Sequence, residues 1–338
     1  MKCRRCRKAA AAIELPSHHA AFCPECFFVF FKKQVREGIK KHRLLSPGDR
    51  VLVCVSGGKD SLVLWDVLMD MGYETEGLYI DLGIEGYSDR SREKVIAYAE
   101  ARGKQPIIVE LTKEGIPIPE AARCVRMQEC SICGTVKRYF FNRIAKEGRF
   151  NAVATGHNLD DESARLLGNI FHWQREHLAR QHPHLPASAE GLVKKVKPLW
   201  RVSELETAAY GFLKEIDYVI EECPMSERAT SLVYKEVLSL IEERMPGSRI
   251  VFYQGFLDKA NPLRTSEWKA TDAASAPAGT LADDGVEYTS DDPENGTKGA
   301  ARSCASCGAL TYAETCAYCR LKELVRKRLE KRAKETNG

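Results

Sequence analysis

The sequence predicts an α/β fold in which helices wrap a parallel sheet and a small cysteine-rich module stands at each end. Strand-like and helix-like segments alternate between residues 50 and 173, which is typical of a parallel sheet. A hydrophobic run at 51–55 leads into a glycine-containing loop, and a helix-like segment follows it. Two CxxC motifs lie near each terminus. These observations predict a ligand-binding core with a metal-binding module at either end.

The limits of the core elements follow from hydrophobic patterning. We expect strands at 50–55, 75–81, 106–110, 151–155 and 218–220. We expect helices at 31–45, 61–71, 89–102, 135–148, 161–173 and 320–335. The stretch 174–195 carries three histidines among prolines and is expected to be a surface loop, because the irregular spacing of its histidines argues against a metal role.

Composition is that of an ordinary globular enzyme. The 338 residues, of which 44% are hydrophobic and 29% charged, can enclose one large core with small appendages. The chain has no run of 18 apolar residues and does not start like a signal peptide, so we expect a cytoplasmic protein that does not associate with a membrane. In that reducing compartment its thirteen cysteines favour metal binding over disulfides.

Each terminus carries four cysteines at the spacing of a zinc site. The candidate ligands are Cys3, Cys6, Cys23 and Cys26 at one end and Cys304, Cys307, Cys316 and Cys319 at the other. Modules this small depend on a metal for folding, so we expect two structural Zn²⁺. His18 or His19 is an alternative ligand in the N-terminal site, although four cysteines make the simpler set.

Charge is spread unevenly along the chain. Residues 265–302 carry eight acidic and three basic side chains, a net charge of −5 against +4 for the whole chain, which leaves +9 for the remainder. A basic body suggests a polyanionic partner. We therefore divide the chain into four parts. These are an N-terminal zinc finger (1–31), a catalytic domain (32–264), a flexible acidic linker (265–302) and a C-terminal zinc ribbon with a basic helix (303–338).

A candidate phosphate-binding loop follows the first core strand. Gly57 and Gly58 allow a tight turn, so that successive N–H groups can point at one anion near the positive end of a helix. Lys59 adds a positive charge, and the hydroxyls of Ser56 and Ser61 can donate to phosphate oxygens. The spacing differs from that of the GxxxxGK[ST] loop. It resembles the PP-loop of the ATP pyrophosphatases, which cut ATP between the α and β phosphates, so we expect ATP to be a substrate.

Three further cysteines form a third group. Cys130 and Cys133 make a CxxC motif just before a predicted helix, and Cys223 lies ninety residues later, followed by Pro224. Such a trio can hold a [4Fe–4S] cluster and leave one iron without a protein ligand. From the spacing alone, two other assignments are equally well supported. One is a metal of another kind, such as a third zinc, and the other is a redox disulfide between Cys130 and Cys133.

Polar residues also follow the predicted strand 151–155. We assign Gly156 and His157 to the nucleotide site. The adjacent Asp160 and Asp161 open a helix, where a negative charge is favoured, and one of them can hold Mg²⁺ on the pyrophosphate or contact nucleic acid. For Asp160 plain N-capping is an equal alternative.

Two basic features fit an RNA partner. Lys137 and its neighbour Arg138 lie one turn after Cys133, where they can steady developing charge or contact an RNA phosphate. The helix 320–335 carries eight basic side chains against three acidic ones. For both features a solvated helix face is the plain alternative.

Taken in order, these motifs resemble the tRNA 2-thiouridine synthetases of the TtuA type, the tRNA-5-methyluridine(54) 2-sulfurtransferases of the PP-loop ATP pyrophosphatase superfamily. The resemblance rests on the SGGKDS loop, the CxxC with a distant Cys-Pro, and a zinc finger at each end. It includes TGHNLDDE at 155–162, KPL at 197–199 and EECPM at 221–225. It covers nearly the whole chain outside 265–302.

The resemblance implies a two-stage reaction. ATP adenylates the O2 of a tRNA uridine and releases pyrophosphate; a sulfur species held on the open iron then attacks C2 and expels AMP. It favours the cluster for the three cysteines, marks Lys137 and Asp161 as catalytic, and makes Asp60 a candidate Mg²⁺ ligand. The family further implies a ubiquitin-like sulfur carrier with a C-terminal thiocarboxylate, and a homodimer.

Three alternatives stay open. The nearest is 2-thiolation of the wobble uridine by the related anticodon-modifying group, although the overall match favours the T-loop position 54. A PP-loop ligase that joins an amine to an adenylated carbonyl would need no cluster. A zinc-ribbon RNA-binding protein without catalysis is the third alternative, which the intact Lys59, Asp60 and Ser61 disfavour.

Overall fold

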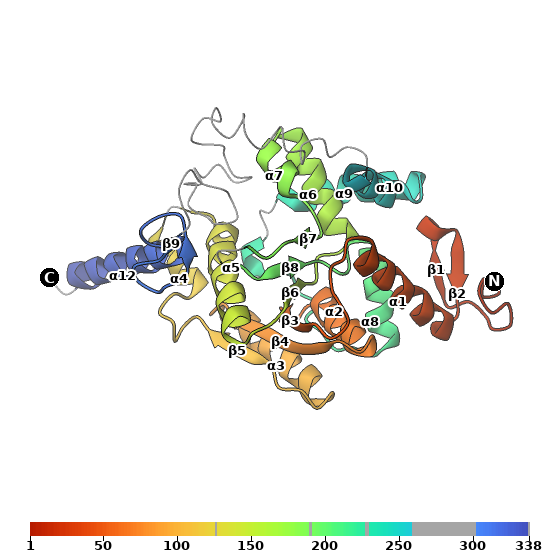
Figure 1. Cartoon of the computed structure of the whole chain (residues 1–338), viewed down its shortest axis with the longest axis horizontal. Helices are drawn as coiled ribbons and strands as arrows, with labels where there is room; N and C mark the ends of the chain where they lie inside the picture. The colour runs from red at the N-terminus through yellow and green to blue at the C-terminus, as the bar shows by residue number, and fades with distance from the viewer. Residues whose placement is uncertain (126, 189–190, 227–229, 259–301, 337–338) are drawn as a thin grey trace.

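The computed structural model describes residues 1–125, 127–188, 191–226, 230–258 and 302–336, and its centre is a six-stranded sheet with helices around it (Figure 1). The strands are β3 (Arg50–Val55), β4 (Glu74–Asp81), β5 (Ile107–Glu110), β6 (Ala152–Thr155), β7 (His184–Leu185) and β8 (Lys194–Val196). Their order is β5-β4-β3-β6-β8-β7, and β7, antiparallel to β8, is the exception to parallel pairing. The predicted α/β class is confirmed.

The strand order reverses beside β3. The chain passes from β3 to β4 and β5 on one side and then returns to place β6 on the other side, where Val53 pairs with Ala154. Ligands of such sheets bind where the order reverses, outside the carboxyl ends of the strands. Val51, Leu52 and Val53 are fully buried because helices cover both faces of the sheet.

The helices of the core surround this sheet. They are α2 (Lys59–Asp70), α3 (Tyr87–Glu100), α4 (Ile118–Cys124), α5 (Glu129–Glu147), α6 (Leu159–Phe171), α7 (Arg175–Arg180), α8 (Glu204–Leu213), α9 (Thr230–Arg244) and α10 (Ser248–Asp258), with the short 3₁₀ helix η2 (Pro224–Ser226). Helix α2 is apolar nearly all round and lies buried, and its Trp65 packs so closely over β4 that a methyl group at Gly77 would stand 2.5 Å from the indole. A residue larger than glycine at position 77 would therefore displace the indole.

Three sequence expectations about the core were wrong. Residues 218–220 form no strand; the Val219 N–H instead donates to the carbonyl of Gly57 at 2.9 Å. The segment 174–195 is not a plain loop, since it holds α7, β7 and the start of β8. Helix α5 begins at residue 129, six residues earlier than expected, because buried Ile132 extends the apolar face of the helix into the first turn.

The N-terminal module packs against the core through α1 (Pro24–Lys41), which contacts α8. A hairpin of β1 (Ile13–Leu15) and β2 (Ala20–Phe22), joined by η1 (Pro16–His18), precedes it. Phe27 and Phe31 of α1 are fully buried, and Phe31 packs on Tyr210 of α8. The module is therefore anchored to the core by aromatic packing.

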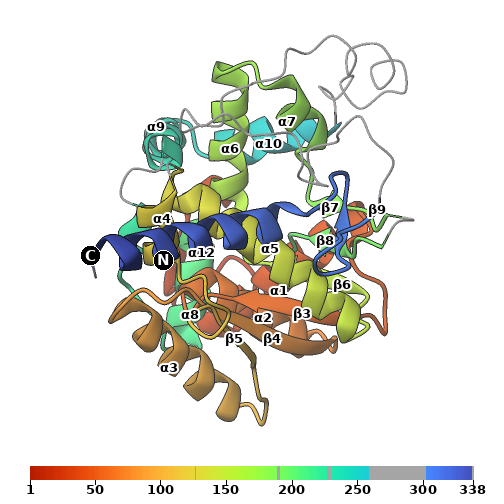
Figure 2. The ribbon, with the colours of Figure 1, turned by 90° about the vertical axis from the view of Figure 1, so that its left-hand side faces the viewer.

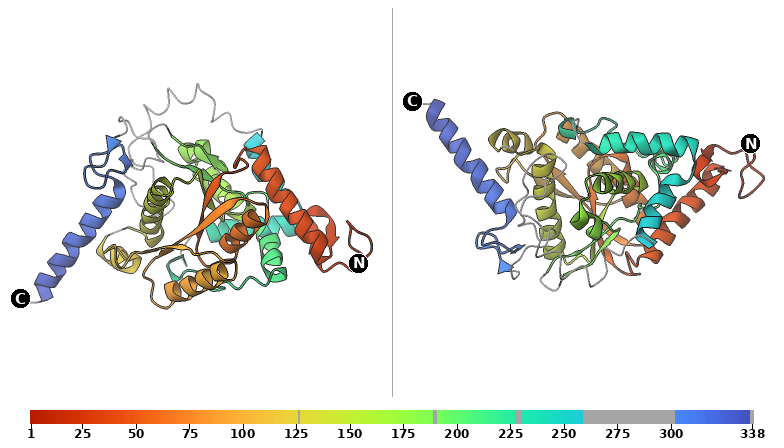
Figure 3. Two further views of the ribbon diagram at one scale, coloured as in Figure 1. Left: turned by 60° about the horizontal axis from the view of Figure 1, so that its bottom comes forward. Right: turned by 90° about the horizontal axis from the view of Figure 1, so that it is seen from above.

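The C-terminal module consists of β9 (Arg302–Ser303), β10 (Leu310–Thr311) and α12 (Ala317–Thr336). Figure 2 shows α12 lying across α4 and α5, which it contacts. Tyr318 stacks on Tyr139 of α5 with ring centres 3.9 Å apart, and Arg332 donates to the carbonyl of Arg123 at 3.0 Å. The two modules stand at opposite ends of the molecule (Figure 3).

The predicted acidic linker lies outside the described residues except for its last residue, Arg302. The four-part division of the chain therefore stays a prediction. Among the described helices, none combines the length and the apolar character that a membrane crossing requires.

Candidate active site

The loop between β3 and α2 is shaped by its own side chains. Gly57 has a φ of 82°, and a methyl group there would stand 2.8 Å from the carbonyl oxygen of Ser91. Both constraints demand glycine. The Ser61 hydroxyl accepts from the N–H of Ser56 at 3.0 Å and donates to the carbonyl of Gly58 at 2.9 Å. The loop is therefore held in a tight turn at the start of α2, where a phosphate is favoured.

A chain of alternating charges runs beside this loop. Lys59 Nζ lies 3.1 Å from Asp60 and 2.7 Å from Glu204 of α8. Lys235 of α9 lies 2.6 Å from Asp161 and 3.4 Å from the same Glu204. The fold thus brings two cations and three carboxylates together at the nucleotide loop. Sequence reasoning missed Glu204 and Lys235.

These contacts shift the acid–base behaviour of the loop residues. Burial raises the pKa of Asp60, against the attraction of Lys59 and a hydrogen bond from the Thr207 hydroxyl. Burial works against the charge of Asp161 as well, but Lys235 overcomes it and lowers the pKa of that carboxyl. Asp161 is consequently ionised, and Asp60 is a largely buried carboxyl held beside the ammonium group of Lys59.

The segment after β6 lies directly against the phosphate loop. A methyl group at Gly156 would stand 2.9 Å from the backbone nitrogen of Ser61, so the two loops touch. Asn158 caps α6 and forms a capping box with Asp161, whose carboxylate accepts from the Asn158 N–H at 3.1 Å. The N-capping alternative for Asp160 is wrong. Asp160 instead pairs with Arg249 and accepts from the N–H of Glu204 at 2.9 Å.

Adding a methyl group at Gly156 should disturb both loops. We expect Gly156→Ala to lower the free energy of unfolding by about 1–3 kcal/mol, because the backbone of Ser61 has to move aside. ATP binding should weaken with it. Urea unfolding and nucleotide titration measure the two effects.

Gly255→Ala is the matched control, since Gly255 lies in α10 and a methyl group there meets nothing within 4 Å. It should keep or raise stability. Equal effects of the two substitutions would contradict the close contact between the loops.

His157 is a neutral hydrogen-bonding residue. Its Nδ1 lies 2.8 Å from the hydroxyl of Thr155. Burial, with the nearby charges of Lys197 and Arg165, lowers the pKa of His157 to about 4. The imidazole therefore stays uncharged at neutral pH and offers one donor and one acceptor beside the nucleotide loop.

This low pKa makes stability depend on pH. An unfolded histidine binds a proton near pH 6.5 and His157 near pH 4, so the unfolded chain binds more protons between these values. Protonation of the buried imidazole costs about 3 kcal/mol of stability; this penalty is absent above pH 6.5 and grows as the pH falls toward 4. We expect His157→Gln to reduce this loss of unfolding free energy between pH 6.5 and 4, as measured by urea unfolding at a series of pH values. His172→Gln, at the far end of α6, should leave the pH dependence as in the wild type. An unchanged pH dependence in His157→Gln would contradict the assignment.

The three remaining candidate ligands converge on one end of α5. Cys130 and Cys133 lie in its first turn, three residues apart and so on one face. Cys223 precedes η2, which packs against α5, and the Cys130 thiol donates to the carbonyl of Met225 at 3.5 Å. Burial raises the pKa of Cys130, and the charges of Cys133 and Cys223 raise it further.

The spacing of this trio differs from that of the terminal cysteines. Among the described residues, two groups have all their ligand atoms within 4.8 Å of one another. These are the two sets of four terminal cysteines, and the trio is not one of them. Sulfurs that share one zinc stand about 3.8 Å apart, as follows from a tetrahedron with Zn–S of about 2.3 Å. A more open set of three thiols fits a larger group, such as an iron–sulfur cluster.

Lys137 lies one turn along α5 from Cys133. The charge of Cys133 is the largest influence that raises the pKa of Lys137, and Cys223 and Tyr87 act in the same direction. Lys137 also acts on Cys54, two residues before the phosphate loop. The ammonium group therefore lies beside Cys133 and within electrostatic range of Cys54 on β3.

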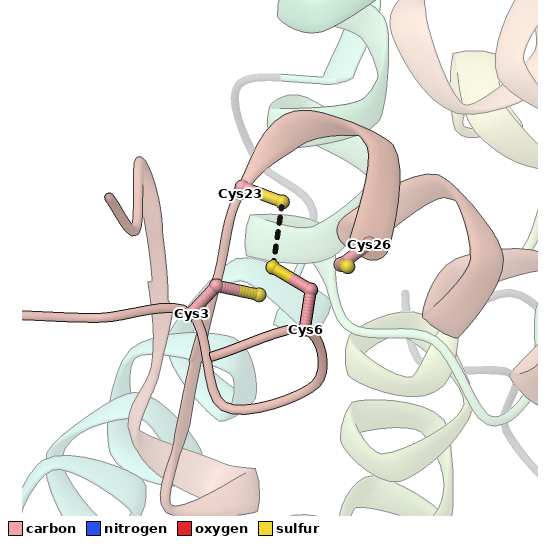
Figure 4. A group of neighbouring side chains, drawn as sticks. All are labelled: Cys3, Cys6, Cys23 and Cys26. Atoms are coloured by element: carbon pink, nitrogen blue, oxygen red, sulfur yellow. Dashed lines mark hydrogen bonds between the residues drawn. The ribbon is translucent and has the colours of Figure 1, made fainter. Parts of the chain in front are cut away.

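The eight terminal cysteines form two compact sets. Figure 4 shows Cys3, Cys6, Cys23 and Cys26 gathered around one point, with the sulfurs of Cys6 and Cys23 4.0 Å apart. At the other end the sulfurs of Cys307 and Cys316 are 3.8 Å apart. Both spacings fit a single tetrahedral zinc.

The N-terminal set does not include a histidine. His18 contacts Glu206 at 3.1 Å. All thirteen cysteines are free thiols, so a disulfide between Cys130 and Cys133 is not formed.

Comparison with known proteins agrees with this site. Residues 2–28 match the N-terminal LIM domain of 2-thiouridine synthetase TtuA, and residues 50–220 match the phosphoadenosine phosphosulfate reductase domain. Over 98% of its length the chain is 42% identical to the tRNA-5-methyluridine(54) 2-sulfurtransferase of Thermus thermophilus, and it covers 94% of that protein. This chain belongs to the tRNA-5-methyluridine(54) 2-sulfurtransferase family.

Two other proteins are similar to this chain. The tRNA-5-methyluridine(54) 2-sulfurtransferase of Thermotoga maritima is 38% identical over 98% of this chain and 99% of its own length. A solved structure titled U34-tRNA thiolase NcsA from Methanococcus maripaludis with its [4Fe-4S] cluster superposes with a TM-score of 0.68. It is 27% identical and covers 76% of this chain and 87% of its own. The resemblance inferred from the motifs, and the PP-loop fold it implied, are confirmed.

Proposed function

We propose that this member of the family is an ATP-dependent tRNA 2-thiolation enzyme that acts on 5-methyluridine 54. The observation that carries the proposal is that the PP-loop touches the segment that leads to the cysteine trio: Val219, four residues before Cys223, donates its N–H to the carbonyl of Gly57 at 2.9 Å. The PP-loop can activate a carbonyl oxygen with AMP, and the cysteine trio can present sulfur to the activated carbon. The 42% and 38% identities to enzymes of that name favour position 54.

In the first stage the chain binds ATP and orients the uridine oxygen. The N–H groups of the loop 56–61 and Lys59 hold the phosphates, with Gly156 and His157 beside them. Asp60 and Asp161, which now pair with Lys59 and Lys235, would hold Mg²⁺ and thereby release the two lysines toward the phosphates. The uridine O2 then bonds to the α-phosphorus as pyrophosphate leaves.

In the second stage sulfur replaces the activated oxygen. Cys130, Cys133 and Cys223 are the residues that would hold a [4Fe–4S] cluster, which when bound supplies an iron able to carry the sulfur atom. The sulfur bonds to C2, and the bond from C2 to the adenylated oxygen breaks to release AMP. Lys137, within reach of Cys133, offsets the negative charge that grows on this oxygen.

Zinc and tRNA complete the proposed assembly. The two sets of four cysteines each hold a structural Zn²⁺. The exposed bases of α12, docked beside the trio through α4 and α5, contact the tRNA backbone. Sulfur arrives from a ubiquitin-like carrier with a C-terminal thiocarboxylate, and the reaction takes place in the cytoplasm.

A homodimer is proposed because α9 presents an exposed apolar stripe. Val233, Val237, Leu240 and Ile241 recur at helical spacing, and Leu240 keeps 52% of its surface exposed. An antiparallel second copy centred on Leu240 would set Glu236 opposite Arg244 of its partner, so the stripe is complementary to itself in charge. Light scattering should show a dimer that Val237→Glu converts to a monomer and that Val29→Glu, on the N-terminal α1, does not; a monomeric wild type would refute the dimer.

Nucleoside mass spectrometry tests the proposed reaction. The enzyme is incubated without oxygen with ATP, a sulfide donor and tRNA that is either unmodified or contains 5-methyluridine. The tRNA is then digested into fragments that are analysed separately. We expect 2-thio-5-methyluridine in the T-loop fragment together with AMP and pyrophosphate. No thiolated nucleoside in any fragment would refute the proposal.

Thiolation of the wobble position is the second candidate. It is favoured by one observation, the TM-score of 0.68 with the U34-tRNA thiolase. In the same digest it would appear as 2-thiouridine in the anticodon fragment. AMP formation without iron in the protein and without thiolation would point instead to the cluster-free ligase.

A further inference from the structure

The proposed reaction places a geometric demand on the target base. Its O2 must first reach the α-phosphate at the loop 56–61, and its C2 must then meet a sulfur at the cysteine trio. One uracil ring therefore has to lie between the two groups. Bases taken out of their helix for chemistry are held by stacking on aromatic side chains.

Tyr87 lies on the helix that contacts the phosphate loop. It is the first residue of α3, and Ser91, one turn later on the same face, contacts Gly57 of that loop. Tyr87 is also packed, partly buried, against the same hydrophobic cluster as Cys133 and Cys223. Helix α3 thus links the phosphate loop to the cluster against which these cysteines pack.

Three other described aromatic residues of this cluster are already engaged. Tyr139 and Tyr318 stack on each other at 3.9 Å, and Phe140 is buried to 1% exposure. Phe141 lies eight residues beyond Cys133, about 12 Å along the helix. Tyr87 is only partly buried, so part of its side chain is accessible.

We propose that Tyr87 is the stacking platform that positions the target uracil between the PP-loop and the three cysteines. This rests on the proposed function. The aromatic ring supplies the stacking, so Tyr87→Phe should keep nearly full activity. Tyr87→Leu keeps an apolar side chain but offers no flat face.

Steady-state kinetics should separate positioning from folding. Because Tyr87→Leu removes the stacking of the base on an aromatic ring, it should lower kcat about 10- to 100-fold. The KM for tRNA should change little, because phosphate contacts over the tRNA body dominate its affinity. Iron content and ATP affinity should stay at the wild-type level. Tyr73→Leu, just before β4 and so at the opposite edge of the sheet, is the matched control.

A photochemical readout reports the contact directly. The probe is tRNA with 5-iodouridine at position 54, whose irradiation links the base to an aromatic ring in van der Waals contact. Mass spectrometry should find the link at residue 87 in the wild type and in Tyr87→Phe, and lose it in Tyr87→Leu. A link to another residue, or an unchanged kcat in Tyr87→Leu, would overturn the proposal. A wild type that thiolates no tRNA would instead refute the proposed function.

Discussion

Replacing Cys130 by alanine should remove the iron and abolish thiolation while both zinc ions remain. Cys130 is one of three thiols that converge at the start of α5, and a cluster held by three protein ligands has none to spare. Loss of residues that merely support a metal ligand already costs about 10–100-fold, so loss of a ligand should exceed that. Iron, labile sulfide and zinc are measured on protein purified without oxygen, and thiolated nucleoside by mass spectrometry.

The matched control for this experiment is Cys124→Ala. Cys124 is a buried cysteine at the end of α4 that belongs neither to the trio nor, among the described residues, to a four-cysteine set, so its loss should leave iron and activity near wild type. About four irons per chain in the wild type, lost in Cys130→Ala alone, would support the cluster. Full iron in Cys130→Ala, or none in the wild type, would contradict it and leave an adenylating enzyme with another nucleophile.

Replacing Lys59 by alanine should lower the rate of pyrophosphate release about 10²–10³-fold. Lys59 is the cation at the loop, and it also neutralises Asp60 and Glu204. Without it two carboxylates face the incoming phosphates, and repulsion adds to the lost attraction. Coupled pyrophosphate assays with tRNA present measure the rate, and calorimetry measures ATP affinity.

Lys94→Ala is the control for Lys59. Lys94 pairs with exposed Asp217 at 2.6 Å on the outside of α3, where such pairs are worth little. The rate should therefore stay near wild type in Lys94→Ala. If Lys59→Ala released pyrophosphate as fast as this control, the loop would not be the phosphate site. Unfolding midpoints of both variants show whether the fold is intact.

Features that depend on neighbours in sequence could be predicted well. The phosphate loop was visible because a hydrophobic strand, two glycines and a helix are consecutive, and local backbone sterics dictate the turn. The terminal cysteine sets were visible because their members lie within a few dozen residues and their spacing suits one ion. The start of α5 was missed because Ile132 stabilises its first turn only by burial against the rest of the core.

The two site residues that the sequence analysis missed were missed for the same reason. Glu204 and Lys235 meet Lys59 and Asp161 only after α8 and α9 fold over the loop. A signal for Glu204 existed, since Ser203-x-x-Glu206 has the pattern of a capping box and forms one, which places Glu204 in the first turn of a helix. No comparable signal marks Lys235, one charged residue on a long surface helix.

By itself the sequence determined the class of fold, the phosphate loop and the two four-cysteine modules, because each is encoded by adjacent residues and local geometry. Only the tertiary structure decided that η2, directly after Cys223, packs against the helix that carries Cys130 and Cys133 about ninety residues earlier, and that Tyr87 packs against the same cluster as Cys133 and Cys223. Contacts of that separation depend on how whole helices pack over the carboxyl edge of the sheet, which no local pattern specifies.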